Sequence, residues 1–148
     1  MKPRMLVPFD FQDLSQHALA WAAELQKTTA ADPMLMVYAV DSHPAVASEG
    51  PVVLVGPSET EINDFRQRMV EAASRLGARA AAEVHVAPRD PGESIIDLAG
   101  RRDIDLIVMG THGRSGIQRV LLGSVAEHVM RHALCPVVTV RNPPETKR

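Results

Sequence analysis

The run Leu106-Ile107-Val108-Met109 stands between Asp105 and Gly110 and is apolar at every position. A strand with one exposed face alternates apolar and polar residues, whereas a strand covered on both faces is apolar throughout. The run therefore predicts a central strand of a parallel sheet that has helices on both of its faces.

Four other short segments have the character of strands. Residues 5–9 and 34–40 are wholly apolar, and each run stops at an aspartate. Residues 80–86 alternate weakly, which predicts a strand near an edge of the sheet, and residues 137–140 form the last strand. The segments between the strands have apolar residues at helical spacing, so strands and helices alternate along the chain. This alternation predicts parallel pairing through right-handed crossovers.

Local signals predict where the helices begin and end. A serine or aspartate followed three residues later by Glu or Gln is typical of a capping box, and the chain has three such pairs: Asp13 with Gln16, Ser58 with Glu61, and Ser124 with Glu127. Pro91-Gly92 predicts the start of a further, short helix, and Gly77 the end of the helix that begins near Ser58. Three large side chains fit the core stripes of these helices: Trp21, Met69 and Met130.

Residues 42–57 are the one long stretch without a regular pattern. They contain Pro44, Gly50, Pro51, Gly56 and Pro57, so we expect a loop, able to act as a mobile flap, although the short run 52–55 is apolar.

Composition excludes several classes of function. The chain has 148 residues, 45% of them hydrophobic, which fits one globular domain. Its net charge is −2 and only 3% of its residues are aromatic, so neither a positive field nor stacking platforms for nucleic acid are expected. Cys135 is the single cysteine, and no run approaches the roughly 18 apolar residues of a membrane span. We therefore expect a cytoplasmic protein that acts on neither nucleic acid nor membranes.

The segment after Met109 is rich in glycine. It contains Gly110, Gly113 and the pair Gly123-Ser124, which opens the last helix. Glycines let the backbone approach a ligand, and a helix N-terminus presents free N–H groups to an anion. The segment therefore predicts a phosphate site, in which Arg114 or Arg119 neutralises charge. It is neither a Walker A loop nor a G-x-G-x-x-G loop, because the spacing differs.

The spacing does resemble the G-2X-G-9X-G-[S/T] signature of the ATP-binding branch of the universal stress protein family. Residues 6–10 resemble the opening strand of that family with its acidic residue, and residues 135–138 resemble its last strand. The resemblance implies a universal stress protein domain over residues 1–142, followed by a disordered tail, 143–148. Its fold is expected to be a single-domain three-layer α/β/α sandwich, Rossmann-like and similar to the adenine nucleotide alpha hydrolases, with a five-stranded parallel sheet of order 3-2-1-4-5.

The resemblance also implies a set of nucleotide-binding residues. Around adenine and ribose it places Pro8, Phe9, Asp10 and Val40; at the sugar Met109 and Gly110; and at the phosphates Gly113, Arg114, Gly123, Ser124 and Val125. The expected ligand is ATP with Mg²⁺. One departure concerns Asp10, which is followed by Phe11-Gln12-Asp13 rather than by the Gly-Ser frequent in relatives.

Structural explanations compete at several of these positions. Asp10 can be a ribose or magnesium ligand, or only a turn former before the first helix. The glycines can serve tight turns and close packing alone. His112 is more simply a solvated loop residue than a proton shuttle. His128, His132 and Cys135 resemble a metal face, but Pro136 shows that Cys135 has left the helix, which favours two surface histidines and a buried thiol.

The sequence leaves three functions open. The first is a regulatory stress-response protein whose bound nucleotide changes the surface offered to partners. The second is a slow ATPase, although the sequence has no Walker lysine, no evident base and no Ser-His-Asp order. The third is a nucleotide-free dimerisation module.

The last strand also predicts a homodimer. Residues 136–141 should lie at a sheet edge, yet Val137-Val138-Thr139-Val140 carries no charge and its only proline stands at its start. Such an edge can pair with the same strand of a second copy around a two-fold axis, and the family resemblance implies the same arrangement.

Overall fold

The computed structural model describes residues 2–45, 50, 53–87, 90–111 and 122–141. The elements are, in chain order, β1 (Met5–Pro8), α1 (Asp13–Thr29), β2 (Met34–Asp41), β3 (His43–Ala45), β4 (Val53–Val55), α2 (Glu59–Arg75), β5 (Ala80–Ala87), α3 (Pro91–Arg101), β6 (Leu106–Gly110), α4 (Ser124–His132) and β7 (Val137–Val140).

The main sheet has five parallel strands in the order β5-β2-β1-β6-β7. Counted along the sheet-forming strands, this is the order 3-2-1-4-5, so the predicted topology is confirmed. The wholly apolar runs became the inner strands because both of their faces are covered: Leu6, Val7, Ile107 and Val108 are all fully buried. The weakly alternating segment became β5, at an edge as expected.

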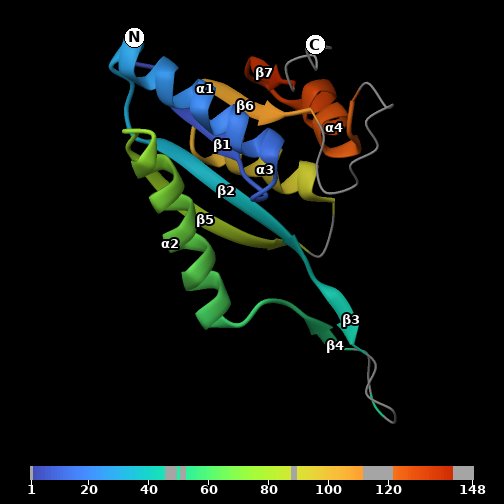
Figure 1. Ribbon diagram of the computed structural model, residues 1–148. Helices are drawn as coiled ribbons and strands as arrows, with labels where there is room; N and C mark the ends of the chain where they lie inside the picture. Colours follow the sequence, from blue (N-terminus) through green and yellow to red (C-terminus); the bar gives the residue numbers. More distant parts are fainter. Residues whose placement is uncertain (1, 46–49, 51–52, 88–89, 112–121, 142–148) are drawn as a thin grey trace, which may run out of the picture.

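Helices cover both faces of this sheet (Figure 1). The core on one face packs against α1 and α2 and contains Leu19, Met36 and Met69 among its buried side chains. The core on the other face packs against α3 and α4 and contains Ile95, Leu98 and Val129. Successive residues of the inner strands alternate between the two cores, as the pleat of a strand requires.

Two of the three predicted capping boxes are wrong. Ser58 and Glu61 do form the reciprocal pair at the start of α2. The N-caps of α1 and α4, however, are Gln12 and Gly123, and neither helix start has a side-chain cap bond. In both helices the polar residue chosen from the sequence is one position too late, because it already has helical geometry.

The prediction of core side chains is also wrong for two of the three residues. Met69 is fully buried, but 43% of Trp21 and 48% of Met130 are exposed. The buried positions of α1 are mostly small residues, among them Ala18, Ala22 and Ala23, so the broad aromatic ring lies beside the stripe rather than in it.

Residues 42–57 contain regular structure that the sequence pattern did not reveal. β3 and β4 pair in antiparallel fashion, with His43 opposite Val55 and Ala45 opposite Val53. Figure 1 shows this hairpin beyond the end of β2, away from the helices. A Cβ placed on Gly56 would stand 2.9 Å from Val86 Cγ1, so the base of the hairpin contacts β5.

No helix in the described part of the chain is long and apolar enough to cross a membrane. The predicted tail, 143–148, lies outside the described residues, as do Gly113, Arg114 and His112.

Candidate functional site

The candidate site lies where β1 and β6 end side by side. These strands pair in parallel, with Met5 opposite Leu106 and Leu6 opposite Ile107, so their carboxyl ends reach the same edge of the sheet. The chain leaves β1 toward β2 on one side, while β6 and β7 lie on the other. This is the reversal point of the winding, beyond which open α/β sheets bind their ligands.

Asp10 forms the centre of a tight turn at the end of β1. Its Oδ1 accepts a hydrogen bond from the Gln12 N–H at 3.0 Å, and its own N–H donates to Ser15 Oγ at 3.3 Å. The Ser15 hydroxyl donates to the Gln12 carbonyl at 2.9 Å. Ser15 is buried and was not singled out by the sequence patterns. These three bonds hold the Asp10 carboxylate at the edge of the sheet with lone pairs left for a further donor.

Phe11 follows in a backbone conformation unusual for its residue type. Its φ is +65°, in the left-handed region that glycine adopts without steric cost. For a residue with a Cβ this conformation costs about 1–2 kcal/mol. Something in the surroundings of Phe11 must therefore hold it there.

The two ends of the glycine-rich segment meet at Thr111. The Gly123 N–H donates to the Thr111 carbonyl at 2.6 Å, and the Thr111 N–H donates to the Val140 carbonyl of β7 at 3.1 Å. Thr111 is 1% exposed. Thr111 thus ties the end of β6 both to β7 and to the start of α4. No local sequence pattern indicates this role of Thr111, because the bonds join residues from three separate segments.

Close packing alone explains why position 110 is a glycine, without any ligand. A Cβ at this position would stand 2.9 Å from Leu14 Cβ and 3.1 Å from the backbone carbonyl atoms of Leu14. The first turn of α1 therefore packs directly on the end of β6. This contact supports the packing explanation for one of the motif glycines.

The first turn of α4 supplies donors at the same edge. Ser124 is the first helical residue and is exposed, and Val125 follows it. Their N–H groups have no carbonyl four residues earlier within the helix, and the helix dipole makes this end partly positive. Together with the Ser124 hydroxyl, these groups are suited to an anion.

Four predicted site residues contribute side chains to the cores. Phe9 and Met109 are each 4% exposed, in the cores on opposite faces of the sheet. Val40 is partly buried against the core beneath α1 and α2, and Val125 against the core beneath α3 and α4. At the edge itself the structure brings together Pro8, Asp10, Gly110, Gly123, Ser124 and Val125.

Two histidines of α4 lie against each other. The rings of His128 and His132 stack with centroids 4.4 Å apart, and His132 Nδ1 is 2.8 Å from the His128 carbonyl oxygen. Among the described residues no group of three or more His, Cys, Asp or Glu could hold a metal ion. Cys135 is half-buried and free, and its burial raises the pKa of the thiol.

The fold is that of a three-layer α/β protein, and its candidate site follows the ends of β1 and β6. A family model, "Universal stress protein family", matches residues 1–141, and the chain belongs to that family. The Universal stress protein MJ0531 of Methanocaldococcus jannaschii is 33% identical over 95% of this chain and 82% of its own length. The Universal stress protein YxiE of Bacillus subtilis is 31% identical over 93% of this chain and 98% of its own length.

Solved structures share the fold. The universal stress protein UspA from Lactobacillus plantarum has a TM-score of 0.74 at 24% identity, covering 95% of this chain and 99% of its own. An Archaeoglobus fulgidus relative solved in complex with dAMP has a TM-score of 0.66 at 23% identity, covering 93% and 96%. One from Arabidopsis thaliana with AMP bound has a TM-score of 0.62 at 18% identity, covering 99% and 95%.

Proposed function

We propose that this protein binds ATP, with Mg²⁺ on its triphosphate, at the edge formed by the ends of β1 and β6. The observation that carries the proposal is the convergence at one edge of the Asp10 turn, the Thr111–Gly123 closure and the first turn of α4. A carboxylate for a ribose hydroxyl and amides for phosphate are the chemistry that an adenine nucleotide requires. Related proteins with dAMP and AMP support the choice of ligand class.

The donor set at this edge fits a nucleotide in kind. The Ser124 hydroxyl and the amides of Ser124 and Val125 suit phosphate oxygens. Gly113 and Arg114 complete the phosphate site in this proposal, as the sequence motif implies. Asp10, with one oxygen on the Gln12 amide, retains acceptor capacity for a ribose hydroxyl. Mg²⁺ would be held chiefly by the phosphates, since it takes few protein ligands in such sites.

The role that follows is regulatory. Bound nucleotide would change the shape of the surface that the protein offers to partner proteins. We place this activity in the cytoplasm, because a chain with one cysteine is typical of a reducing compartment.

Calorimetric titration with Mg·ATP tests the binding. We expect the wild type to bind and Gly113→Val to lose binding, because a branched side chain would occupy the place of the phosphates. Gly100→Val is the matched control: no atom lies within 4 Å of a Cβ at Gly100, on the exposed side of α3. Unchanged ATP affinity in folded Gly113→Val would show that the phosphate assignment is wrong. Mass spectrometry of ligand released from denatured protein identifies the nucleotide carried from the cell.

An ATPase is the second candidate, and turnover separates it from a binding protein. We expect hydrolysis far below the enzyme median of about 10 turnovers per second, because no described side chain at the edge is placed to activate water. A magnesium-dependent rate of that order in pure protein would make ATP hydrolysis the better-supported function. No nucleotide binding at all, with an intact dimer, would leave the dimerisation module as the function.

We further propose a homodimer paired through residues 136–141. All four residues of β7 are only half-buried, and β7 lies at the end of the sheet. Exposed apolar side chains flank it: Leu134 is 99% exposed just before the strand, and Met130 is 48% exposed on α4. Pairing of two β7 strands around a two-fold axis would satisfy both edges and cover this apolar surface.

A further inference from the structure

All three phenylalanines and the single tyrosine of the chain meet at one place. The ring of Phe11 lies 5.0 Å from that of Phe9, 5.3 Å from that of Tyr38 and 5.8 Å from that of Phe65, between centroids. The first and second of these contacts are edge-on, the arrangement that aromatic quadrupoles favour. This aromatic cluster joins the turn after β1, which carries Phe9 and Phe11, to β2 and α2.

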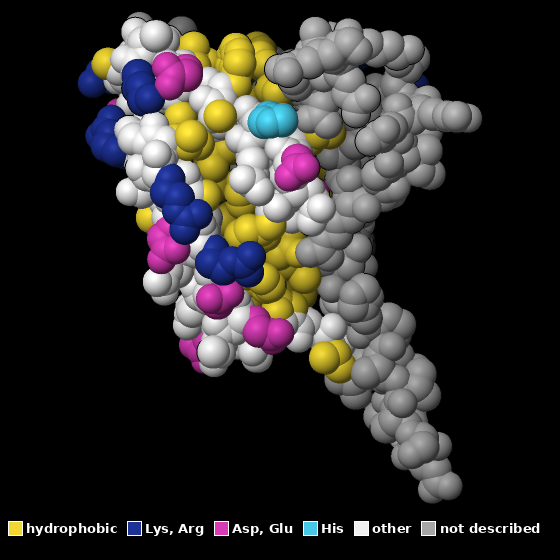
Figure 2. Space-filling model, in the orientation of Figure 1, with side chains coloured by type: hydrophobic (Ala, Val, Ile, Leu, Met, Phe, Trp, Pro, Cys, Tyr) yellow, Lys and Arg dark blue, Asp and Glu magenta, His cyan; other side chains and the backbone are white. Residues whose placement is uncertain are grey.

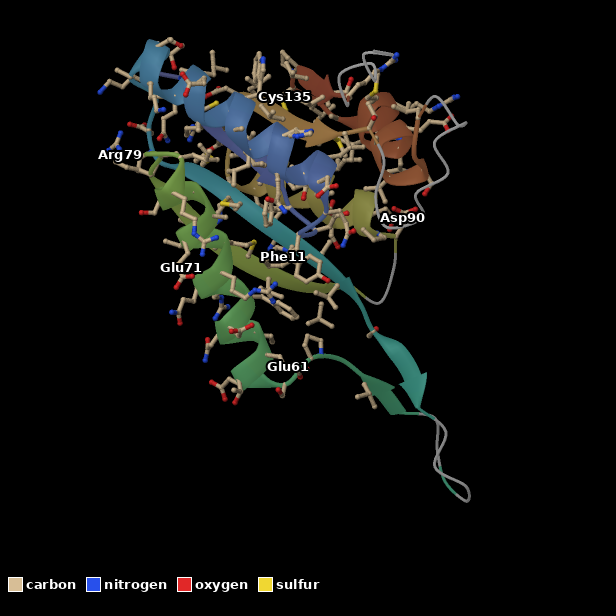
Figure 3. All side chains as sticks on the ribbon, viewed as in Figure 1. Phe11, Glu61, Glu71, Arg79, Asp90 and Cys135 are labelled. Carbon is tan, nitrogen blue, oxygen red and sulfur yellow. The ribbon has the colours of Figure 1, made fainter. Side chains whose placement is uncertain are left out.

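Phe11 is the member at the centre of the aromatic cluster. Figure 3 shows it between the start of α1 and the side of α2, and Figure 2 shows apolar side chains gathered in the same region between the two helices. Phe9 and Tyr38 are buried, whereas Phe11 and Phe65 are only partly covered. The ring of Phe11 therefore fills the space where α1 and α2 diverge.

A cation covers the remaining side of the ring. The guanidinium carbon of Arg68, on α2, lies 4.4 Å from the centroid of Phe11. Arg68 is itself held by Asp64, with Nη1 and Oδ2 3.5 Å apart. A guanidinium over an aromatic face is attracted by the ring. The left-handed backbone of Phe11 is thus over-determined by contacts with Phe9, with Tyr38 of β2 and with two residues of α2.

The same backbone sets the geometry of Asp10. The Asp10 carboxylate accepts from the Gln12 amide, and this bond spans Phe11. If the φ of Phe11 changed, the Gln12 N–H would point elsewhere and the carboxylate would lose its partner. The ring and the carboxylate are therefore connected through two rotatable bonds of the main chain.

From this geometry we infer that Phe11, secured by Arg68, is a positioning residue that holds Asp10 in its ligand-accepting orientation and links α2 to the nucleotide site. The inference rests on the proposed nucleotide binding. Phe11 itself contacts aromatic side chains and Arg68, and it acts on the ligand only through the turn. The steric cost of its φ is what makes the orientation of Asp10 depend on the ring contacts.

Hydrogen exchange of the Gln12 amide, followed by NMR without ligand, tests the first half of the inference. In Phe11→Gly we expect this amide to exchange about tenfold faster, because glycine keeps φ +65° accessible but allows many other conformations. Phe11→Tyr, which keeps the ring, should exchange like the wild type. Equal exchange in Phe11→Gly and wild type would overturn the inference without reference to any nucleotide.

ATP affinity, measured by calorimetry, tests the second half. We expect Phe11→Gly to bind ATP about tenfold more weakly than the wild type, and Phe11→Tyr, which keeps the ring, to bind ATP like the wild type. Arg68→Met should weaken binding by a smaller factor, whereas Arg66→Met, whose guanidinium bonds Asn63 on the same helix, should not change it. Urea unfolding of each variant separates loss of affinity from loss of fold.

A double-mutant cycle with Asp10→Ala distinguishes action through the carboxylate from a general effect. If Phe11 acts through Asp10, Phe11→Gly will not weaken ATP binding further in the Asp10→Ala background. Additive losses would overturn the inference and leave the proposed function intact. A wild type that binds no adenine nucleotide would overturn both.

Discussion

The two edges of the sheet differ in how they are protected. On β5, Glu83 forms ion pairs with His85, at 2.9 Å, and with Arg102 at the end of α3. The base of the β3–β4 hairpin further contacts Val86 of the same strand. On β7, by contrast, Val137-Val138-Thr139-Val140 has no charged side chain. Charges and covering segments are what keep an edge strand from pairing with another chain. Within the described residues, the sheet is therefore protected at β5 and unprotected at β7.

The direction of the backbone groups makes this contrast testable. The Pro136 carbonyl accepts from Ile107 of β6 and the Val140 carbonyl from Thr111, just after β6. By the alternation of a strand, Thr139 therefore directs its N–H and carbonyl outward. On the other edge, the Arg79 carbonyl accepts from Met34 of β2, which directs the groups of Val84 outward. Thr139 and Val84 are therefore equivalent positions on opposite edges.

The largest expected effect comes from proline at these two positions. Thr139→Pro removes an outward N–H from β7 without touching the ladder to β6, so we expect the dimer to become a monomer at micromolar concentration. Val84→Pro makes the same change on β5 and should leave the dimer mass unchanged. Light scattering coupled to size exclusion measures both. A monomeric wild type, or a dimer that survives Thr139→Pro, would show that β7 is not the interface.

Removing the charges from β5 should make the two edges alike. In the double variant Glu83→Thr, His85→Thr we expect association beyond the dimer, because a chain with two open edges can join copies end to end. Static light scattering over a concentration series would reveal this as a mass that rises with concentration. A variant that stays dimeric at every concentration would mean that the ion pairs do not guard the edge.

The protection at β5 should weaken in acid. Burial raises the pKa of the Glu83 carboxyl, but the hydrogen bond with His85 and the charge of Arg102 outweigh it and hold this pKa below its ordinary value of 4.5. The contribution of the carboxylate to stability is therefore complete above about pH 4.5 and is lost as pH falls through the lowered, folded-state pKa. Urea unfolding at a series of pH values should show a steeper acid loss for the wild type than for Glu83→Gln. Parallel curves would contradict this prediction.

The smallest expected effect concerns the rim of β7. Leu134 is almost fully exposed, so Leu134→Ser should change the free energy of unfolding of the monomer by less than about 0.5 kcal/mol. If the residue borders the dimer, the same change should raise the dimer dissociation constant a few-fold, as dilution experiments can measure. Glu59→Gln, at the distant start of α2, serves as the unaffected control. An unchanged dissociation constant for Leu134→Ser would place Leu134 outside the interface.

The fold could be predicted from the sequence because its strongest signals are local. The apolar runs of β1, β2 and β6 are unambiguous, and their alternation with helices leaves few topologies. The β3–β4 hairpin was missed because Pro and Gly dominate its pattern, and local signals do not reveal which short apolar pieces pair. The helix starts at Asp13 and Ser124 were misjudged because a capping motif can be matched one residue out of register.

The candidate site could be predicted only in part. The motif located the edge, and the structure brings Asp10, Gly110 and Ser124 to it. Ser15 and Thr111 were missed because a buried hydroxyl or a bridging backbone leaves no pattern in the sequence. Phe11 was noticed only as a departure from relatives, since its role depends on the ring of Phe65 and on Arg68, more than fifty residues away.

The contact between Gly110 and Leu14 has an evolutionary consequence. Because the helix backbone leaves no room for a Cβ at position 110, selection for folding alone preserves this glycine. Under the proposed nucleotide binding, a descendant that no longer binds nucleotides should keep Gly110 while position 113 changes freely, unless the residue at 14 and the entry angle of α1 change together. Glycine at 110 then indicates the fold, whereas the later glycines of the motif indicate the proposed ligand.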